Sequence, residues 1–141
     1  MNIEIRTMSI DDYGDVCRLW ERKPGIGLSS SDGRNEIASF LEANPGLSLV
    51  ARDDMLLAGA VLCGHDGRRG YIHHLAVDGA YRRCGVASDL IDHCLAGLHG
   101  QGIPKCHLSV YGNNDQAIDF WRKTGWTERA ELIMMSRLTS G

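Results

Sequence analysis

The sequence predicts a single α/β (α+β) domain that spans residues 1–141. Two observations predict this class. Strand-like and helical segments alternate in the order β-α-α-β-β-β-α-β-α-β, with no internal repeat and no linker between them. The chain is also long enough, with 43% apolar residues, to bury one core without disulfides or a structural metal.

The N-terminal part is predicted to form a strand and two helices. Residues 3–5 alternate as a short strand does, and Ser9 and Asp12 have the spacing of a capping box that opens a helix. Residues 23–33 contain the glycines, proline and serines of a loop. Helical spacing returns over residues 37–41, so a second helix is expected before Asn44-Pro45-Gly46.

The middle of the chain has the pattern of an antiparallel meander. Residues 47–52 and 56–63 are apolar runs separated by Asp53-Asp54, and the turn over residues 65–70 leads into a third strand over residues 71–77. Period-2 alternation predicts that His73 shares a face with Tyr71, whereas His74 points to the opposite face and packs against a helix.

The last part is predicted to form two helices and two strands. An apolar face over residues 86–98 indicates a helix that ends at Gly100-Gln101-Gly102. Residues 105–110 alternate as a strand, a helix follows its cap at residues 113–115, and residues 129–138 form a closing strand.

Composition argues against several classes of function. A net charge of −3 gives no basic field for nucleic acid, and no stretch of apolar residues is long enough to span a membrane. The five cysteines lack the spacing of metal sites, so no metal is expected. Because the N-terminus lacks the pattern of a secretory signal, we expect a cytoplasmic protein with free thiols.

Residues 82–87, RRCGVA, stand where a strand turns into a helix. The first amides of a helix have no intrahelical partner and favour anions. Gly85 allows a ligand to approach the backbone, small Ala87 leaves room, and Arg82 and Arg83 add positive charge, so a diphosphate suits this turn. The alternative is an ordinary turn flanked by exposed arginines. Neither GxxxxGK[ST] nor GxGxxG after the first strand is present, which disfavours nucleoside triphosphates and nicotinamide cofactors.

Two motifs carry a resemblance to a known family. Residues 77–87, VDGAYRRCGVA, resemble the coenzyme A pyrophosphate loop of the GNAT superfamily of N-acyltransferases, with its pattern [Q/R]-x-x-G-x-[G/A]. Residues 114–126, NDQAIDFWRKTGW, resemble the N-x-x-A-x-x-[FL]-Y-x-x-x-G-[FY] segment of that family. The resemblance covers nearly the whole chain. It implies a GNAT fold, in which about four helices flank a central mixed, mostly antiparallel sheet of six to seven strands, and acetyl-CoA as the co-substrate.

The resemblance also implies a set of coenzyme-binding residues. Main-chain groups of the strand would pair with the pantetheine arm, the amides of the turn would hold the pyrophosphate, and Asn114 would contact the pantetheine or simply cap its helix. The implied residues are Leu75, Ala76, Val77, Arg82, Arg83, Cys84, Gly85, Val86, Ala87, Asn114, Ala117, Phe120 and Trp121.

The implied reaction is direct attack of a neutral primary amine on the thioester in a ternary complex, which needs a proton acceptor. His73 is the candidate base, because its ordinary pKa near ~6.5 suits proton transfer at neutral pH, and Tyr71 lies beside it. The alternative is a hydrogen-bonded sheet histidine. Trp121 stands where many members carry the tyrosine that protonates the thiolate, so Tyr111 is the candidate replacement. The candidate catalytic residues are therefore His73, Tyr71 and Tyr111.

The acceptor is not specified by any motif. Trp20 and Glu21 are the candidate substrate-binding residues, although an amphipathic helix explains them equally well. We expect an enzyme that acetylates a small-molecule amine or amino acid. The alternatives are a protein N-terminal acetyltransferase that resembles the ribosomal-protein alanine type, and a coenzyme A-binding regulatory module without turnover. Either a monomer or a homodimer is compatible with the sequence.

Overall fold

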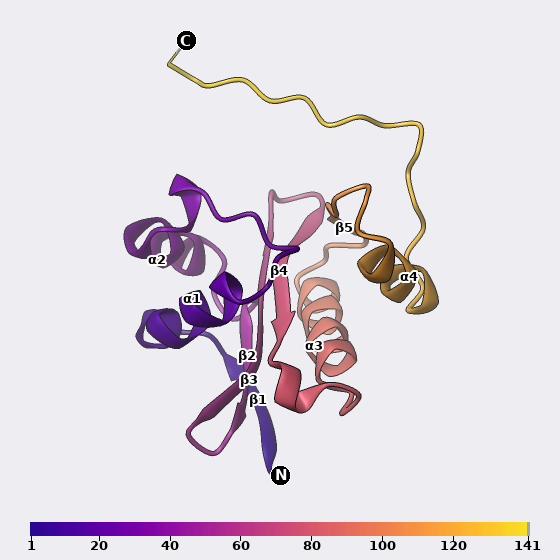
Figure 1. Ribbon diagram of the computed structural model, residues 1–141. Coiled ribbons are helices and arrows are strands. Elements are labelled where there is room, and N and C mark those ends of the chain that lie inside the picture. The colour runs from indigo at the N-terminus through magenta and orange to yellow at the C-terminus, as the bar shows by residue number, and fades with distance from the viewer. Residues whose placement is uncertain (141) are drawn as a thin grey trace. The chain divides into compact units, whose positions relative to one another are not determined.

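Five strands of the protein form one sheet in the order β1-β2-β3-β4-β5 in the computed structural model, which describes residues 1–140 (Figure 1). Neighbouring strands from β1 to β4 are antiparallel, and β4 and β5 are parallel. The predicted mixed, mostly antiparallel sheet is therefore confirmed. The strands are β1 (Ile3–Thr7), β2 (Leu49–Asp53), β3 (Leu56–His65), β4 (Gly70–Val77) and β5 (Cys106–Leu108).

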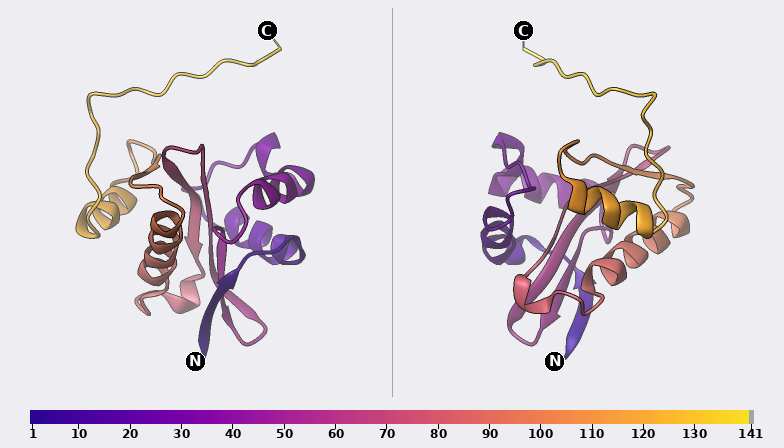
Figure 2. Two further views of the ribbon diagram at one scale, coloured as in Figure 1. Left: turned by 180° about the vertical axis from the view of Figure 1, so that it is seen from behind. Right: turned by 45° about the vertical axis from the view of Figure 1, so that its right-hand side comes forward.

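Three helices flank this sheet. α1 (Tyr13–Glu21) and α2 (Arg34–Ala43) cover one face, and α3 (Val86–Gly100) covers the other (Figures 1 and 2). Short 3₁₀ turns precede α1, α2 and α3; they are η1 (Ile10–Asp12), η2 (Ser30–Asp32) and η3 (Gly79–Tyr81). The predicted cap before α1 is present, because the Ser9 N–H donates to the Asp12 carboxylate at 2.9 Å.

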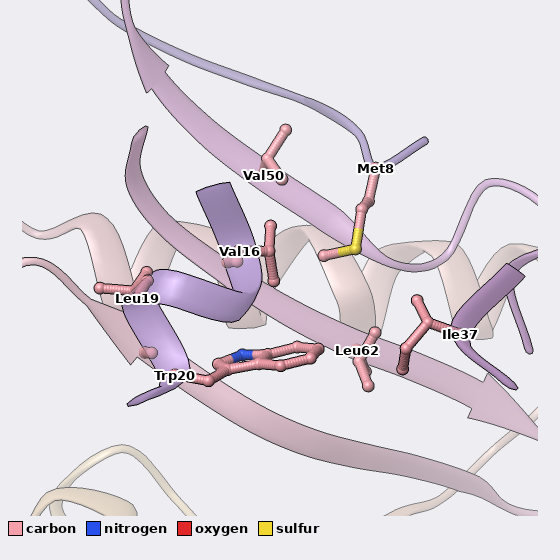
Figure 3. Packing of buried hydrophobic residues seen from close by; sticks show 9 residues of the cluster. Met8, Val16, Leu19, Trp20, Ile37, Val50 and Leu62 are labelled. Atoms are coloured by element: carbon pink, nitrogen blue, oxygen red, sulfur yellow. The ribbon is translucent and has the colours of Figure 1, made fainter. Parts of the chain in front are cut away.

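The core under α1 and α2 is built from two sets of apolar side chains. One set recurs at helical spacing in the helices, and the other alternates along the strands of the sheet. Val16, Leu19 and Trp20 of α1 pack over Val50 of β2 and Leu62 of β3 (Figure 3). All five side chains are buried, and Trp20 and Leu19 have no exposed surface. The removal of this apolar area from water is the main force that holds α1 on the sheet.

The sheet contains one irregularity that bears on function. Along the β3–β4 ladder Ala60 pairs with Ala76, but Leu62 pairs with His73, so β4 contains one residue more than β3 between these pairs. The extra residue forms a β-bulge, and His74 has a φ of 53°, in the left-handed region.

Two sequence-based expectations about strands are wrong. The sheet has five strands rather than six or seven, because residues 129–138 form no strand: they are exposed, and Ala130 and Glu131 lie in a turn. The strand predicted over residues 105–110 is limited to β5, since its ladder with β4 ends at Leu108. Burial and a pairing partner decide whether an apolar run becomes a strand, and the run at residues 132–135 has neither.

The described chain divides into two units, Met1–Ser109 and a second unit that begins at Val110. The second unit contains α4 (Asp115–Lys123), which Asn114 caps by accepting a hydrogen bond from the Ala117 N–H at 3.2 Å. No helix among residues 1–140 combines the length and the apolar character needed to cross a membrane.

Candidate active site

The turn between β4 and α3 has the backbone of an anion-binding site. Gly85 adopts a φ of 78° directly before α3 begins at Val86, and Arg83 also lies in the left-handed region, with a φ of 61°. Within residues 1–140, the backbone N–H groups from Arg83 to Ser88 donate to no protein acceptor. These amides, together with the positive end of the α3 dipole, are available to an anion.

The side chains of this turn leave the amides accessible. Arg82, Arg83 and Cys84 are exposed, and a Cβ on Gly85 would meet no atom within 4 Å, so the space above the turn is open. Within the described residues, the only hydrogen bond from the Cys84 thiol to an oxygen goes to the carbonyl of Arg82, two residues earlier, at 3.5 Å. A diphosphate would meet several amides and two guanidinium groups here.

The strand that leads into this turn has a free edge. β4 pairs with β5 only from Gly70 to Ile72, so beyond Ile72 the ladder with β3 is the only one that β4 forms within the first unit. The predicted coenzyme-binding residues Leu75, Ala76 and Val77 lie in this half of β4 and are partly or wholly buried. An extended ligand can add to such an edge by main-chain hydrogen bonds, as an additional strand would.

His73 lies at the beginning of this free edge, on the face that α1 and α2 cover. Its ring is stacked on the Tyr71 ring at a centroid distance of 6.4 Å and meets the Phe40 ring of α2 edge-on at 6.0 Å. The side chain keeps an exposed edge, but desolvation by the surrounding residues, followed by the nearby His74, lowers the pKa of His73 below its usual value. Its imidazole is therefore predominantly neutral at pH 7 and can accept a proton.

The prediction that His74 points to the opposite face is wrong, because the bulge rotates it. His74 turns toward α1 and η2: its ring meets the Trp20 ring edge-on at 5.0 Å, and its Nε2 lies 2.9 Å from Asp32 Oδ1. The Trp20 indole N–H also donates to the His74 carbonyl oxygen at 3.1 Å. Both histidines consequently belong to the same layer of the molecule.

The two predicted acceptor-binding residues differ in accessibility. Trp20 has no exposed surface and forms part of the core beneath His74, so it cannot present an open aromatic wall. Glu21 is exposed and accepts a hydrogen bond from the Cys17 thiol at 3.4 Å. The aromatic rings that surround His73 in the first unit are instead those of Phe40 and Tyr71, with the His107 ring 5.9 Å from that of Tyr71.

The remaining predicted residues belong to the second unit. Tyr111 is 58% exposed, and Asn114 is engaged as the cap of α4. Trp121 packs edge-on against Phe120 and Trp126, with ring centroids 5.1 and 5.3 Å away. Ala117 supplies the N–H that Asn114 caps. The roles of these residues toward a coenzyme stay predictions.

Sequence reasoning missed Asp32 and Phe40. Asp32 is separated from His74 by 42 positions, and no motif links the two residues. Phe40 was expected only as an apolar residue of its helix. No group of three or more potential metal-ligating side chains occurs within residues 1–140.

Comparisons with known proteins agree on one family. Residues 14–126 match the model of the acetyltransferase (GNAT) family. An acetyltransferase of Pectobacterium atrosepticum is 35% identical over 135 residues, which cover 96% of this chain and 94% of that protein. An acetyltransferase of Sodalis glossinidius is 32% identical over the same shares of each chain. The crystal structure of the PaiA N-acetyltransferase from Thermoplasma acidophilum, in complex with coenzyme A, is 19% identical and has a TM-score of 0.80, covering 90% of this chain and 91% of that one.

Proposed function

Because the chain belongs to the acetyltransferase (GNAT) family, we propose that this acyltransferase moves the acetyl group of acetyl-CoA to a primary amine of a small molecule or amino acid. One observation supports the proposal most directly. The free edge of β4 begins at a neutral imidazole, His73, and runs straight into a turn of open amides and arginines. Acetyl-CoA is an extended molecule with a thioester at one end and phosphates further along. Its thioester suits the end of the β4 edge at His73, and its phosphates suit the turn before α3.

The donor side is assigned to residues of β4 and the following turn. The amides from Arg83 to Ala87 would bind the pyrophosphate, and the main chain from Leu75 to Val77 would pair with the pantetheine arm. The thioester supplies an electrophilic carbonyl and a thiolate leaving group. An edge N–H of β4 would donate to the oxygen of that carbonyl as negative charge develops on it.

The acceptor side is assigned to His73 and its aromatic neighbours. His73 would take the proton that the attacking amine loses, directly or through a water molecule, while the C–N bond forms and the C–S bond breaks. Phe40 and Tyr71 hold the ring in place by contact. Tyr111 is proposed as the donor that protonates the departing thiolate, since the indole of Trp121 cannot release a proton at this pH.

An acetylation assay tests this function. We expect coenzyme A release with at least one member of a panel of small amines and amino acids, and a loss of rate in His73→Gln. Peptides that begin with alanine form the second arm, and turnover on those peptides alone would instead indicate a protein N-terminal acetyltransferase. Tight binding of acetyl-CoA without turnover on either arm would favour a regulatory module.

The proton donor needs a separate test. We expect Tyr111→Phe to lower kcat more than KM, because the phenol acts only after substrate is bound. Trp121→Phe tests the indole separately, and because Trp121 is also a predicted coenzyme-binding residue, its KM for acetyl-CoA is measured beside its kcat. An unchanged kcat in Tyr111→Phe would remove Tyr111 from the mechanism.

A further inference from the structure

The residue after the candidate base is held in a conformation that its own backbone disfavours. His74 has a φ of 53°, and a residue with a Cβ pays to occupy this left-handed region. Three contacts compensate for this cost. The Trp20 indole donates to the His74 carbonyl at 3.1 Å, the two rings meet edge-on at 5.0 Å, and His74 Nε2 lies 2.9 Å from Asp32 Oδ1.

Asp32 is in turn fixed on every side. Its second carboxylate oxygen accepts a hydrogen bond from the Ser29 N–H at 3.0 Å, and its backbone carbonyl accepts one from the Tyr13 hydroxyl at 2.8 Å. The side chain of Asp32 is 12% exposed and that of His74 is 21% exposed, so their hydrogen bond is largely protected from water. A charge-assisted bond in such surroundings is stronger than one at the surface.

We propose that the His74–Asp32 pair is a clamp that fixes the segment of residues 22–33 against the bulge of β4 and so shapes the acceptor side of the site beside His73. His74 is then a positioning residue that touches no reacting atom. The inference rests on the proposed function for its consequence in catalysis, but the clamp itself is a property of the folded chain.

The clamp also brings charge close to His73. Desolvation is the main cause that lowers the pKa of His73, His74 lowers it further, and Asp32 raises it, so replacement of His74 by a neutral residue leaves only desolvation opposed to the carboxylate. The other titratable or charged groups around Asp32 are Tyr13 and Cys17 of α1 and Arg34 of α2. These three groups are kept in the variants below, so the direction in which the pKa of His73 changes is set by the loss of His74.

Three variants separate the clamp from its charge. His74→Asn removes the reach to Asp32 but keeps a residue that tolerates the left-handed backbone. His74→Gln keeps an N–H that can donate to Asp32 without an imidazole. His65→Asn is the matched control, because it breaks a similar hydrogen bond, from His65 Nε2 to Gln101 Oε1 at 3.0 Å, at an exposed position.

Hydrogen exchange and NMR test the clamp without any substrate. We expect the amides of residues 22–33 to exchange about tenfold faster in His74→Asn than in the wild type or in His65→Asn, and His74→Gln to restore most of the protection. The His73 ring should titrate at a higher pH in both His74 variants. Equal exchange in His74→Asn and the wild type, with an unmoved His73 titration, would overturn the proposal.

Kinetics test its consequence. In His74→Asn we expect the KM for the acceptor to rise about fivefold to tenfold, with the KM for acetyl-CoA unchanged. Asp32→Ala combined with His74→Asn should raise the acceptor KM no further than Asp32→Ala alone, because Asp32→Ala already breaks the clamp and also removes the hydrogen bond from the Ser29 N–H. Additive effects would contradict the pairing. Absence of turnover in the wild type would refute the proposed function and leave the exchange experiment decisive.

Discussion

His73 is exposed, but neighbouring residues displace part of the water around its ring, and this desolvation lowers its pKa. The neighbouring Phe40 and Tyr71 rings cannot stabilise a positive charge as bulk water does, and the nearby His74 lowers the pKa of His73 further. The charged form is therefore disfavoured, so the free base persists to a lower pH than in a solvated imidazole.

The pH dependence of the reaction follows from this shift. Below its pKa His73 is protonated and cannot act as a base, so the acid limb of kcat/KM should lie below the ordinary histidine value of 6.5. His73→Gln should remove that limb and lower kcat/KM by about 10²- to 10³-fold. A limb that survives in His73→Gln would assign the titration to another group.

Cysteine reactivity provides a second test at the scale of single residues. Cys84 is exposed, whereas desolvation raises the pKa of Cys17 and raises that of Cys106 to about 12. We expect iodoacetamide to label Cys84 first, as followed by mass spectrometry, and coenzyme A to protect it. Cys17 is the internal control, because its slower labelling should not respond to coenzyme A. Unprotected Cys84 would place the coenzyme elsewhere.

Among the elements, the turn before α3 depends on a single glycine. Gly85 adopts a φ of 78°, where a residue with a Cβ costs about 1–2 kcal/mol. Gly46, in the turn between α2 and β2, has a φ of 80° and equally open space. The two glycines therefore carry the same backbone penalty, and only Gly85 belongs to the proposed donor site.

This match makes a controlled experiment possible. We expect Gly85→Ala and Gly46→Ala to lose similar stability in urea unfolding, but only Gly85→Ala to weaken coenzyme A binding, by about tenfold in Kd by calorimetry. The reason is that the new methyl group would occupy the space through which the pyrophosphate approaches the amides. An unchanged Kd in Gly85→Ala would separate this turn from the coenzyme.

Local patterns predicted those elements whose formation depends on neighbours in sequence. The apolar face of α3, the Asn114 cap and the open turn at Gly85 were all predictable in this way. The bulge at His74 was not, because register depends on what the partner strand presents. The strand expected at residues 129–138 failed for a related reason, since apolar alternation indicates a strand only if a partner strand pairs with it.

Across the first unit, a buried charge cluster joins helix to sheet. Arg52 of β2 donates to Asp12 at 2.7 Å and to Asp15 at 2.9 Å, while its Nε has no partner among residues 1–140. The side chains of Arg52 and Asp12 are only 10% and 11% exposed, so both charges depend on each other for compensation.

Removal of the arginine should therefore be costly. We expect Arg52→Ala to lower the free energy of unfolding in urea by about 3–5 kcal/mol, because it leaves a buried carboxylate unpaired. Asp12→Asn combined with Arg52→Met should recover part of this loss, since the buried charges are then absent together. A loss below 1 kcal/mol in Arg52→Ala would show that water reaches the cluster.

Hydrogen bonds from Arg52 and Arg18 lower the pKa of Asp15. The stabilising contribution of Asp15 is therefore present above its usual pKa of 3.8 and is lost as the pH falls through the lowered value.

The extra residue in β4 has a consequence for how this sheet tolerates changes in chain length. Pairs on either side of the bulge keep the same faces, with Ala60 opposite Ala76 and Leu62 opposite His73. A chain that lacked one residue between His73 and Ala76 would close a continuous ladder without turning any other side chain over. Deletion of one residue at this point should thus alter the site while the rest of the sheet keeps its pairing.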